Sequence, residues 1–285
     1  MEKYKTASLA IAAVVLSEPI YAEVTATART GYFFDDFSSG GVSSGGDVDF
    51  IVANDPFEFP MFGGSLSAKF DSFTPNTRYT ASLLYGEAET SRSLLGGTTI
   101  DSSSSRVSSI RIDSTAKAER VDFEFTSETR LTGFANLVLG IRYEESLISI
   151  EDSQITRRLL DEGSEQILVD NAPLGDGLDW YKLYTARAGI ASSIPIDAAN
   201  KHRAYANVLA FAGHREVKPG GDGVPLDEAN VLGPDLAVGY NYALSEDVSF
   251  DLRYRAAVFF FVSGRRDFGD AKVTHGPMIS LSKRF

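Results

Sequence analysis

The last 13 residues of this chain, 273–285, alternate between apolar and polar side chains and end on an aromatic residue, and this pattern most constrains the fold. Counting back from Phe285, one face holds Leu281, Ile279 and Val273, and the other holds Ser282, Ser280, Gly276 and Thr274. Successive side chains of a β-strand point to opposite faces of its sheet. The pattern therefore predicts a strand that touches lipid on one side and a polar interior on the other.

Similar alternation recurs in about ten segments, each long enough to cross a bilayer as a tilted strand. They are residues 24–34, 59–70, 77–88, 116–126, 132–144, 178–192, 203–214, 231–244, 248–262 and 271–285. No segment has the roughly 18 consecutive apolar residues that a spanning helix needs. The segments therefore predict an all-β protein whose strands cross the membrane.

The connections between these segments alternate in length. Short turns are predicted at 71–76, 127–131, 195–202 and 245–247, and long polar loops at 35–58, 89–115, 145–177 and 215–230, with a shorter loop at 263–270. This layout predicts an antiparallel up-and-down transmembrane β-barrel of about ten strands, with the short turns in the periplasm. Eight or twelve strands remain possible, because residues 166–169 could extend a hairpin or add strands.

The amino-terminal residues predict a secretory signal peptide, 1–22, before a barrel domain at 23–285. Lys3 and Lys5 precede an apolar run at 7–16, and small residues follow it at 17–22. This order is typical of signal peptides, and the run is too short for a membrane helix. The chain has no cysteine and a net charge of −12, so neither disulfides nor nucleic-acid binding are expected.

The aromatic carboxyl terminus, the alternating segments and the signal peptide together resemble those of Gram-negative outer-membrane β-barrel proteins. The segment Leu139-Gly-Ile-Arg-Tyr143 is similar to a strand found in many small bacterial barrels. The resemblance implies location in the outer membrane, contact with its lipid and lipopolysaccharide, and insertion by the barrel assembly machinery through the C-terminal strand. It also implies a monomer, and it selects no subfamily.

Alternation within each segment predicts which charged side chains line the barrel interior. They are Arg29, Arg120, Asp122, Glu124, Arg142, Glu144, Arg187, Asp251, Arg253 and Arg255. An arginine or lysine facing lipid would cost roughly 2–4 kcal/mol near the bilayer midplane, which enforces the inward assignment. Two interpretations follow: an ion-pair network that plugs the barrel, or a narrow polar path that favours anions.

Aromatic residues near the predicted rims suit the two membrane interfaces, where amphipathic rings gather. They are Tyr32, Tyr85, Trp180, Tyr184, Tyr240, Tyr242 and Phe285.

Catalytic motifs of outer-membrane enzymes are absent. The omptin proteases carry an Asp two residues before a His, and the membrane phospholipases carry a His two residues before a Ser. Neither spacing occurs around His202, His214 or His275. His214 with Glu216 is the only pair that suggests activity, and no enzyme is predicted.

The first long loop is acidic, with Asp35, Asp36, Asp47, Asp49, Asp55 and Glu58 and no basic residue between them. Such a loop can hold Ca²⁺, but a solvated acidic loop is the simpler interpretation, so no metal or cofactor is predicted. The expected function is a non-enzymatic, porin-like barrel, either a narrow channel or a plugged structural barrel. A surface adhesin acting through the long loops is the alternative, and an outer-membrane hydrolase is third.

Overall fold

The computed structural model describes residues 22–38, 48–54, 57–70, 76–101, 106–161, 164–173, 177–219, 227–262 and 271–285. The predicted signal peptide therefore lies outside the described residues except for Ala22. No helix among the residues described here is long and apolar enough to cross a membrane.

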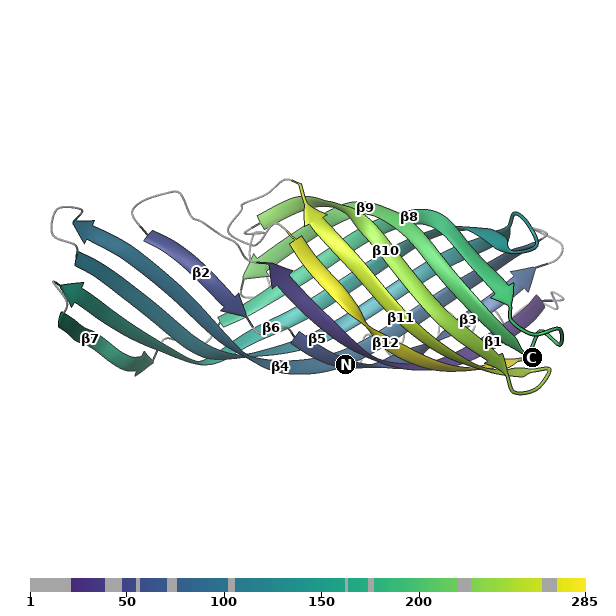
Figure 1. Cartoon of the computed structure of the whole chain (residues 1–285), viewed down its shortest axis with the longest axis horizontal. Helices are drawn as coiled ribbons and strands as arrows, with labels where there is room; N and C mark the ends of the chain where they lie inside the picture. Colours follow the sequence, from purple (N-terminus) through teal and green to yellow (C-terminus); the bar gives the residue numbers. More distant parts are fainter. Residues whose placement is uncertain are drawn as a thin grey trace.

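The described chain consists of β-strands (Figure 1). They are β1 (Ala22–Ser38), β2 (Val48–Asn54), β3 (Phe57–Phe70), β4 (Thr77–Asp101), β5 (Arg106–Arg130), β6 (Ala135–Asp161), β7 (Ser164–Pro173), β8 (Gly177–Pro195), β9 (His202–Pro219), β10 (Asp227–Ala243), β11 (Val248–Phe261) and β12 (Ala271–Arg284). All ten segments expected from the sequence are present, and β2 and β7 are additional.

Ten of these strands close into an antiparallel barrel, as the alternation predicts. The first and last strands pair directly, with Thr25 opposite Arg284 and Ser38 opposite Ala271. Beyond β12, the backbone N–H of Phe285 donates to the carbonyl of Val24 at 2.9 Å. Closure leaves no unpaired strand edge in the membrane-spanning part of the barrel. A sheet in lipid needs this, because unpaired backbone N–H and C=O groups have no water to bind there.

Short turns gather at one end of the barrel, together with the carboxyl terminus (Figure 1). We refer to this as the periplasmic end and to the opposite one as the outer end. The turn predicted at 127–131 lies instead at 131–134, because β5 continues to Arg130 and β6 begins at Ala135. In this turn Leu131 and Thr132 both donate backbone hydrogen bonds to the carbonyl of Ala135.

Three strands extend far beyond the outer end of the barrel, where the sequence predicts loops. β4, β5 and β6 remain paired up to Asp101 with Arg106 and Val107 with Leu160. β2 joins the free edge of β4 and β7 that of β6, which gives the order β2-β4-β5-β6-β7. The predicted loops 89–115 and 145–177 are therefore mostly sheet, and residues 166–169 extend a hairpin inside β7.

The outer face of the barrel carries a band of exposed apolar side chains. Large hydrophobic residues at least 40% exposed include Phe125, Leu139, Ile141, Ile190, Val208, Leu236, Val238, Leu252, Ile279 and Leu281. A water-soluble barrel would not expose a continuous band of this kind. The outward apolar face, the closed sheet and the polar interior are those of an outer-membrane β-barrel, and the protein resides in that membrane.

Candidate functional site

The interior of the barrel is the candidate functional site, because the predicted charged residues meet there. Those that are buried are Arg120, Asp122, Arg142, Glu144, Arg187 and Asp251. The others, Arg29, Glu124, Arg253 and Arg255, are partly buried and line an interior cavity. Alternation along each strand places them there, since their neighbours in sequence form the lipid-facing band.

The upper ion cluster, nearer the outer end, contains three acids and three bases. It consists of Asp35, Arg120, Asp122, Arg142, Glu144 and Lys272. Arg120 Nη1 donates to both carboxylate oxygens of Asp35 at 2.8 Å. Its Nη2 donates to Glu144 at 3.0 Å. Because β1, β5 and β6 supply these groups, the pairs join separate parts of the wall.

Lys272 of β12 completes the upper ion cluster from another part of the wall. Its Nζ lies 2.8 Å from a carboxylate oxygen of Asp35 and also pairs with Glu144. Arg142 donates to Asp122 at 2.6 Å and to Glu144 at 2.9 Å. Each acid therefore contacts at least two bases, which is how buried charges are stabilised away from water.

The lower ion cluster lies beside the upper one and is also neutral. It consists of Glu124, Arg187, Asp235 and Arg255. Arg255 donates to both oxygens of Asp235 at 2.9 and 2.5 Å and to Glu124 at 3.2 Å. Arg187 donates to Asp235 at 2.9 Å and pairs with Glu124. These contacts join β5, β8, β10 and β11.

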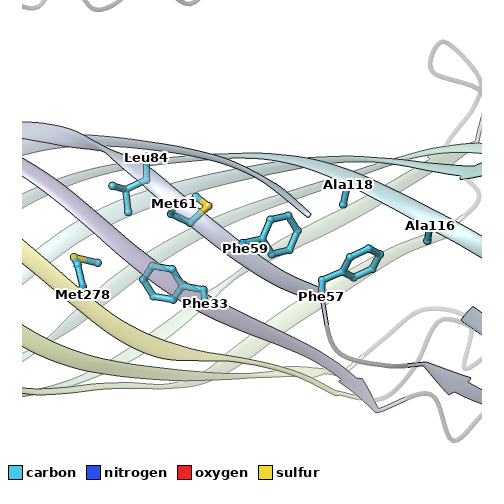
Figure 2. Close-up of a cluster of buried hydrophobic side chains, with 8 residues drawn as sticks. All are labelled: Phe33, Phe57, Phe59, Met61, Leu84, Ala116, Ala118 and Met278. Atoms are coloured by element: carbon cyan, nitrogen blue, oxygen red, sulfur yellow. The ribbon is translucent and has the colours of Figure 1, made fainter. Parts of the chain in front are cut away.

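Two hydrophobic clusters fill the rest of the outer half of the interior. One consists of Phe33, Phe57, Phe59, Met61, Leu84, Ala116, Ala118 and Met278, whose inward-facing side chains Figure 2 shows on neighbouring strands. The other consists of Tyr181, Leu183, Phe211, Val217, Val231, Ala257 and Phe259. Apolar packing on both sides shields the most deeply buried pairs, those of Asp35, Arg120, Glu144 and Lys272, from water.

Cations of the upper ion cluster contact the rings of both hydrophobic clusters. The guanidinium of Arg120 lies 5.6 Å from the Phe59 ring centre, and that of Arg142 lies 5.7 Å from Phe259. Lys272 Nζ lies 5.1 Å from the Tyr181 ring centre. At these distances ring faces attract the cations. Ion pairs and aromatic rings thus form one packed layer across the barrel.

The periplasmic half of the interior is hollow. A cavity of about 540 Å³ adjoins one of about 360 Å³ that reaches the turn Ser245–Asp247, and both are lined by Arg29, Arg78 and Arg253. We call the two together the vestibule. Tyr205 reaches into it over Gly239, where an added Cβ would lie 2.3 Å from the tyrosine ring. The Tyr205 hydroxyl donates to Asp251 and accepts from Arg253.

Two members of the upper ion cluster were missed in the sequence interpretation. Asp35 was placed in the acidic first loop, but it is 2% exposed inside the barrel. Its parity with Arg29 and Phe33 along β1 would have indicated the inward face. Lys272 likewise shares the parity of Thr274 and Gly276. Of the other acids in that loop, Asp47 and Asp55 lie outside the described residues.

The predicted interfacial residues lie on the outward face of their strands at two levels. Toward the outer end, Tyr32 donates to Glu58 and Tyr85 to Glu87, each at 2.5 Å. Tyr184 packs its ring against Tyr143 at 5.1 Å. These tyrosines, with Trp180, mark the upper border of the apolar band.

Trp180 contacts the ammonium group of Lys182 at 5.0 Å from its ring. Toward the periplasmic end, Tyr240 pairs with the ring nitrogen of His202, and Tyr242 stacks on the same ring at 4.8 Å. Phe285 is 72% exposed at the last residue. Amphipathic rings favour membrane–water interfaces, and the assignment of these residues to the two interfaces stays a prediction.

None of the three histidines points into the barrel interior. His214 and Glu216 alternate with the buried Phe211, Arg215 and Val217 and so lie on the outer face. His275 receives a hydrogen bond from, or donates one to, the Tyr254 hydroxyl at 2.7 Å, also outside. In the part of the chain that the structure covers, no group of His, Asp and Glu side chains is arranged to hold a metal ion.

Comparisons with known proteins find similarity in fold alone. No family model matches the sequence, and no curated protein does. Among solved structures, the outer membrane protease OmpT of Escherichia coli is 10% identical, with 93% of this chain and 96% of that chain covered and a TM-score of 0.44. The translocator domain of the autotransporter NalP of Neisseria meningitidis is 13% identical, with 100% and 96% covered and a TM-score of 0.37. Neisserial surface protein A is 9% identical, with 93% and 99% covered and a TM-score of 0.33.

Proposed function

We propose that this protein is a non-enzymatic, porin-like barrel of the plugged kind. Its packed interior closes the lumen and stabilises the barrel in the outer membrane. The observation that carries this proposal is the burial of four charged side chains in mid-lumen. Lys272 and Glu144 are 0% exposed, Arg120 is 1% and Asp35 is 2%. A conducting pore needs water at every level, and charges that line such a pore are hydrated.

The neutrality of both ion clusters supports the same proposal. A path for anions would need basic groups that are free to exchange partners with the solute. Here the acids and bases of the clusters contact one another across the lumen. Moving an ion past them would require breaking buried pairs, which costs several kcal/mol when one partner is lost.

Purified protein inserted in planar bilayers is expected to show no steady current above the detergent control at any voltage. Insertion is verified in parallel by the different gel mobility of boiled and unboiled samples. The variant Phe59→Ala/Phe259→Ala, which removes one ring from each side of the ion pairs, serves as an opened comparison. Stable unitary conductance steps in the unaltered protein would contradict the plugged barrel.

Other proposals concern the surroundings of the barrel. The tyrosine borders would contact lipid and lipopolysaccharide, and the β12 strand with Phe285 would be the segment recognised by the barrel assembly machinery. A monomer is supported by closure within one chain, since β1 pairs with β12 and leaves no edge in the barrel.

A surface adhesin is the second candidate, and the outer sheet β2-β4-β5-β6-β7 favours it (Figure 1). Extended strands that project beyond the membrane place side chains and strand edges where another cell can contact them. The sheet is tied by surface pairs such as Lys117 Nζ with Glu151 at 2.6 Å, a hydrogen bond that raises the pKa of Lys117. This sheet stands where the sequence predicts the long polar loops 89–115 and 145–177.

Removal of residues 93–113, with Arg92 joined to Ser114 through Asn-Gly, tests the adhesin. Arg92 and Ser114 are Cα partners, so a two-residue turn can reconnect β4 and β5. Cells displaying the shortened protein are expected to lose self-aggregation and surface adherence while the barrel keeps its heat-dependent gel mobility. Unchanged adherence of cells with a properly folded, shortened barrel would exclude this function for the hairpin.

A further inference from the structure

The vestibule is a blind, polar chamber rather than part of a path. Its inner end meets the lower ion cluster, since Glu124 and Arg255 belong to both. Its other end reaches the turn Ser245–Asp247 and Arg284, at the end where the short turns lie. A solute could therefore enter and leave only from the periplasmic side.

Most acids that line the vestibule already have strong partners. Asp122 accepts from Arg142 at 2.6 Å, and Glu124 pairs with Arg187 and Arg255. Because Arg142 and Arg187 lie outside the lining, their charges neutralise these two acids from behind the cavity wall.

Four further acids line the chamber, Glu128 and Asp251 along its wall and Glu246 and Asp247 in the turn at its mouth. Asp247 pairs with Arg284 at 3.3 Å. Glu128 accepts a hydrogen bond from Asn136 at 2.5 Å. Asp251 accepts from the Tyr205 hydroxyl at 2.9 Å and lies 3.7 Å from Arg253. Asp251 is therefore already engaged by the Tyr205 hydroxyl and by the guanidinium of Arg253.

Arg29 is a basic group of the vestibule without an ion-pair partner among the described residues. It lies in β1 opposite Ser280 and Gly63, lines both cavities, and forms no ion pair with any described carboxylate. Its Nε is buried and has no hydrogen-bond partner. The charged groups that act most strongly on it include Arg253, Arg255 and Asp251.

Arg203 adds a further donor to the same chamber. Its Nε donates to the Ser193 hydroxyl at 2.9 Å, and no described carboxylate lies within ion-pair distance of it. The polar wall also carries the amides of Asn207 and Asn241. Together these groups offer N–H donors to a ligand that supplies negatively charged oxygens.

We propose that the vestibule binds a small oxyanion from the periplasm, with Arg29 as its main ligand and Arg253 and Arg203 as supporting donors. A partly buried guanidinium that forms no ion pair and whose Nε has no acceptor is unfavourable, and a carboxylate or phosphate can accept two parallel N–H bonds from it. The cavity of about 540 Å³ accommodates such an ion with ordered water. Entry from the periplasm alone rests on the proposed plug, whereas binding at Arg29 requires only the donors that line the vestibule.

Calorimetric titration of the full mature protein in non-ionic detergent, at low ionic strength, tests the proposal with inorganic phosphate, acetate and citrate as separate probes. Binding of phosphate alone identifies a phosphate site, and binding of acetate or citrate alone identifies a carboxylate site. Binding of both identifies a general oxyanion site. Absence of heat with all three probes up to millimolar concentration overturns the proposal.

Arg29→Gln is expected to weaken binding at least about tenfold, because it removes the charge and the bidentate donor. Arg29→Lys should retain part of the affinity, since it keeps the charge without the planar fork. Arg111→Gln is the matched control, because Arg111 is exposed on the outer extension of β5. Equal affinity in Arg29→Gln and the unaltered protein would overturn the assignment.

A second measurement needs no variant. Phenylglyoxal labels accessible arginines, and bound anion should protect Arg29 in the unaltered protein while Arg111 continues to react. Mass spectrometry of the digested protein measures both residues in one sample. Labelling of Arg29 that does not change with saturating anion would count against the site even if Arg29→Gln fails to fold.

Discussion

Replacing Arg120 with methionine is expected to lower the free energy of unfolding by about 3–5 kcal/mol, the usual cost of removing one partner from a buried ion pair. Arg120 is 1% exposed and contacts Asp35 and Glu144. Its loss leaves Asp35 with Lys272 alone and Glu144 with less neutralising charge. Urea titration of the protein in detergent, followed by gel mobility and by tryptophan fluorescence, measures the change.

Two further variants distinguish loss of the buried ion pair from other effects of replacing an arginine on the free energy of unfolding. Arg111→Met removes an exposed arginine from the same strand, where its partner Asp113 is also exposed, and should leave the unfolding midpoint nearly unchanged. Arg120→Met combined with Asp35→Asn should cost less than the sum of the two single changes by about 1–3 kcal/mol. Strict additivity would show that the pair is not coupled, despite its 2.8 Å contacts.

The sequence predicts the barrel because every spanning strand must present apolar side chains to lipid on its outer face. In β6, for example, Leu139 and Ile141 meet lipid while Arg142 and Glu144 do not. A charged side chain that faces lipid is energetically costly, so apolar and polar residues alternate strictly along each spanning strand, and this alternation can be recognised in the sequence. The ten spanning strands and the inward charges follow from that single constraint.

The outer sheet could not be predicted in this way. The first five residues of β4 beyond Ala88 are Glu, Thr, Ser, Arg and Ser, which are equally typical of loops. Outside the membrane no lipid imposes an apolar face, and pairing of β4 with β5 depends on backbone hydrogen bonds that any sequence can make. Strand length there is determined by tertiary pairing rather than by local composition.

The side chains that form the packed layer in the outer half of the interior could not be predicted from the sequence, for a different reason. Near the outer end of β11 the run Ala257-Val-Phe-Phe-Phe261 is apolar on both faces, so alternation no longer distinguishes inside from outside. Phe259 is 1% exposed and Phe260 is 46% exposed, although the two rings are chemically the same. Only the register with the neighbouring strands separates them.

A substitution on the lipid face provides the other large expected effect. Val208→Arg should destabilise the barrel by about 2–4 kcal/mol, the cost of an arginine near the bilayer midplane. Val208 is 60% exposed in the middle of β9, and its cross-strand partners are Ile190 and Leu236, both apolar and outward-facing. Unfolding in phospholipid vesicles measures the change under conditions where the hydrocarbon is present.

The neighbouring residue supplies the matched control. Asn207 lines the vestibule, so Asn207→Arg places the same side chain in a hydrated chamber and should cost less than about 1 kcal/mol. The comparison isolates the direction of the side chain, because the two positions differ by one residue along the same strand. Equal destabilisation by the two substitutions would show that β9 does not separate lipid from a polar interior, and the assignment of faces throughout the barrel would then fail. A large effect at Val208 alone would show that the apolar residues of the alternating pattern face the hydrocarbon of the membrane.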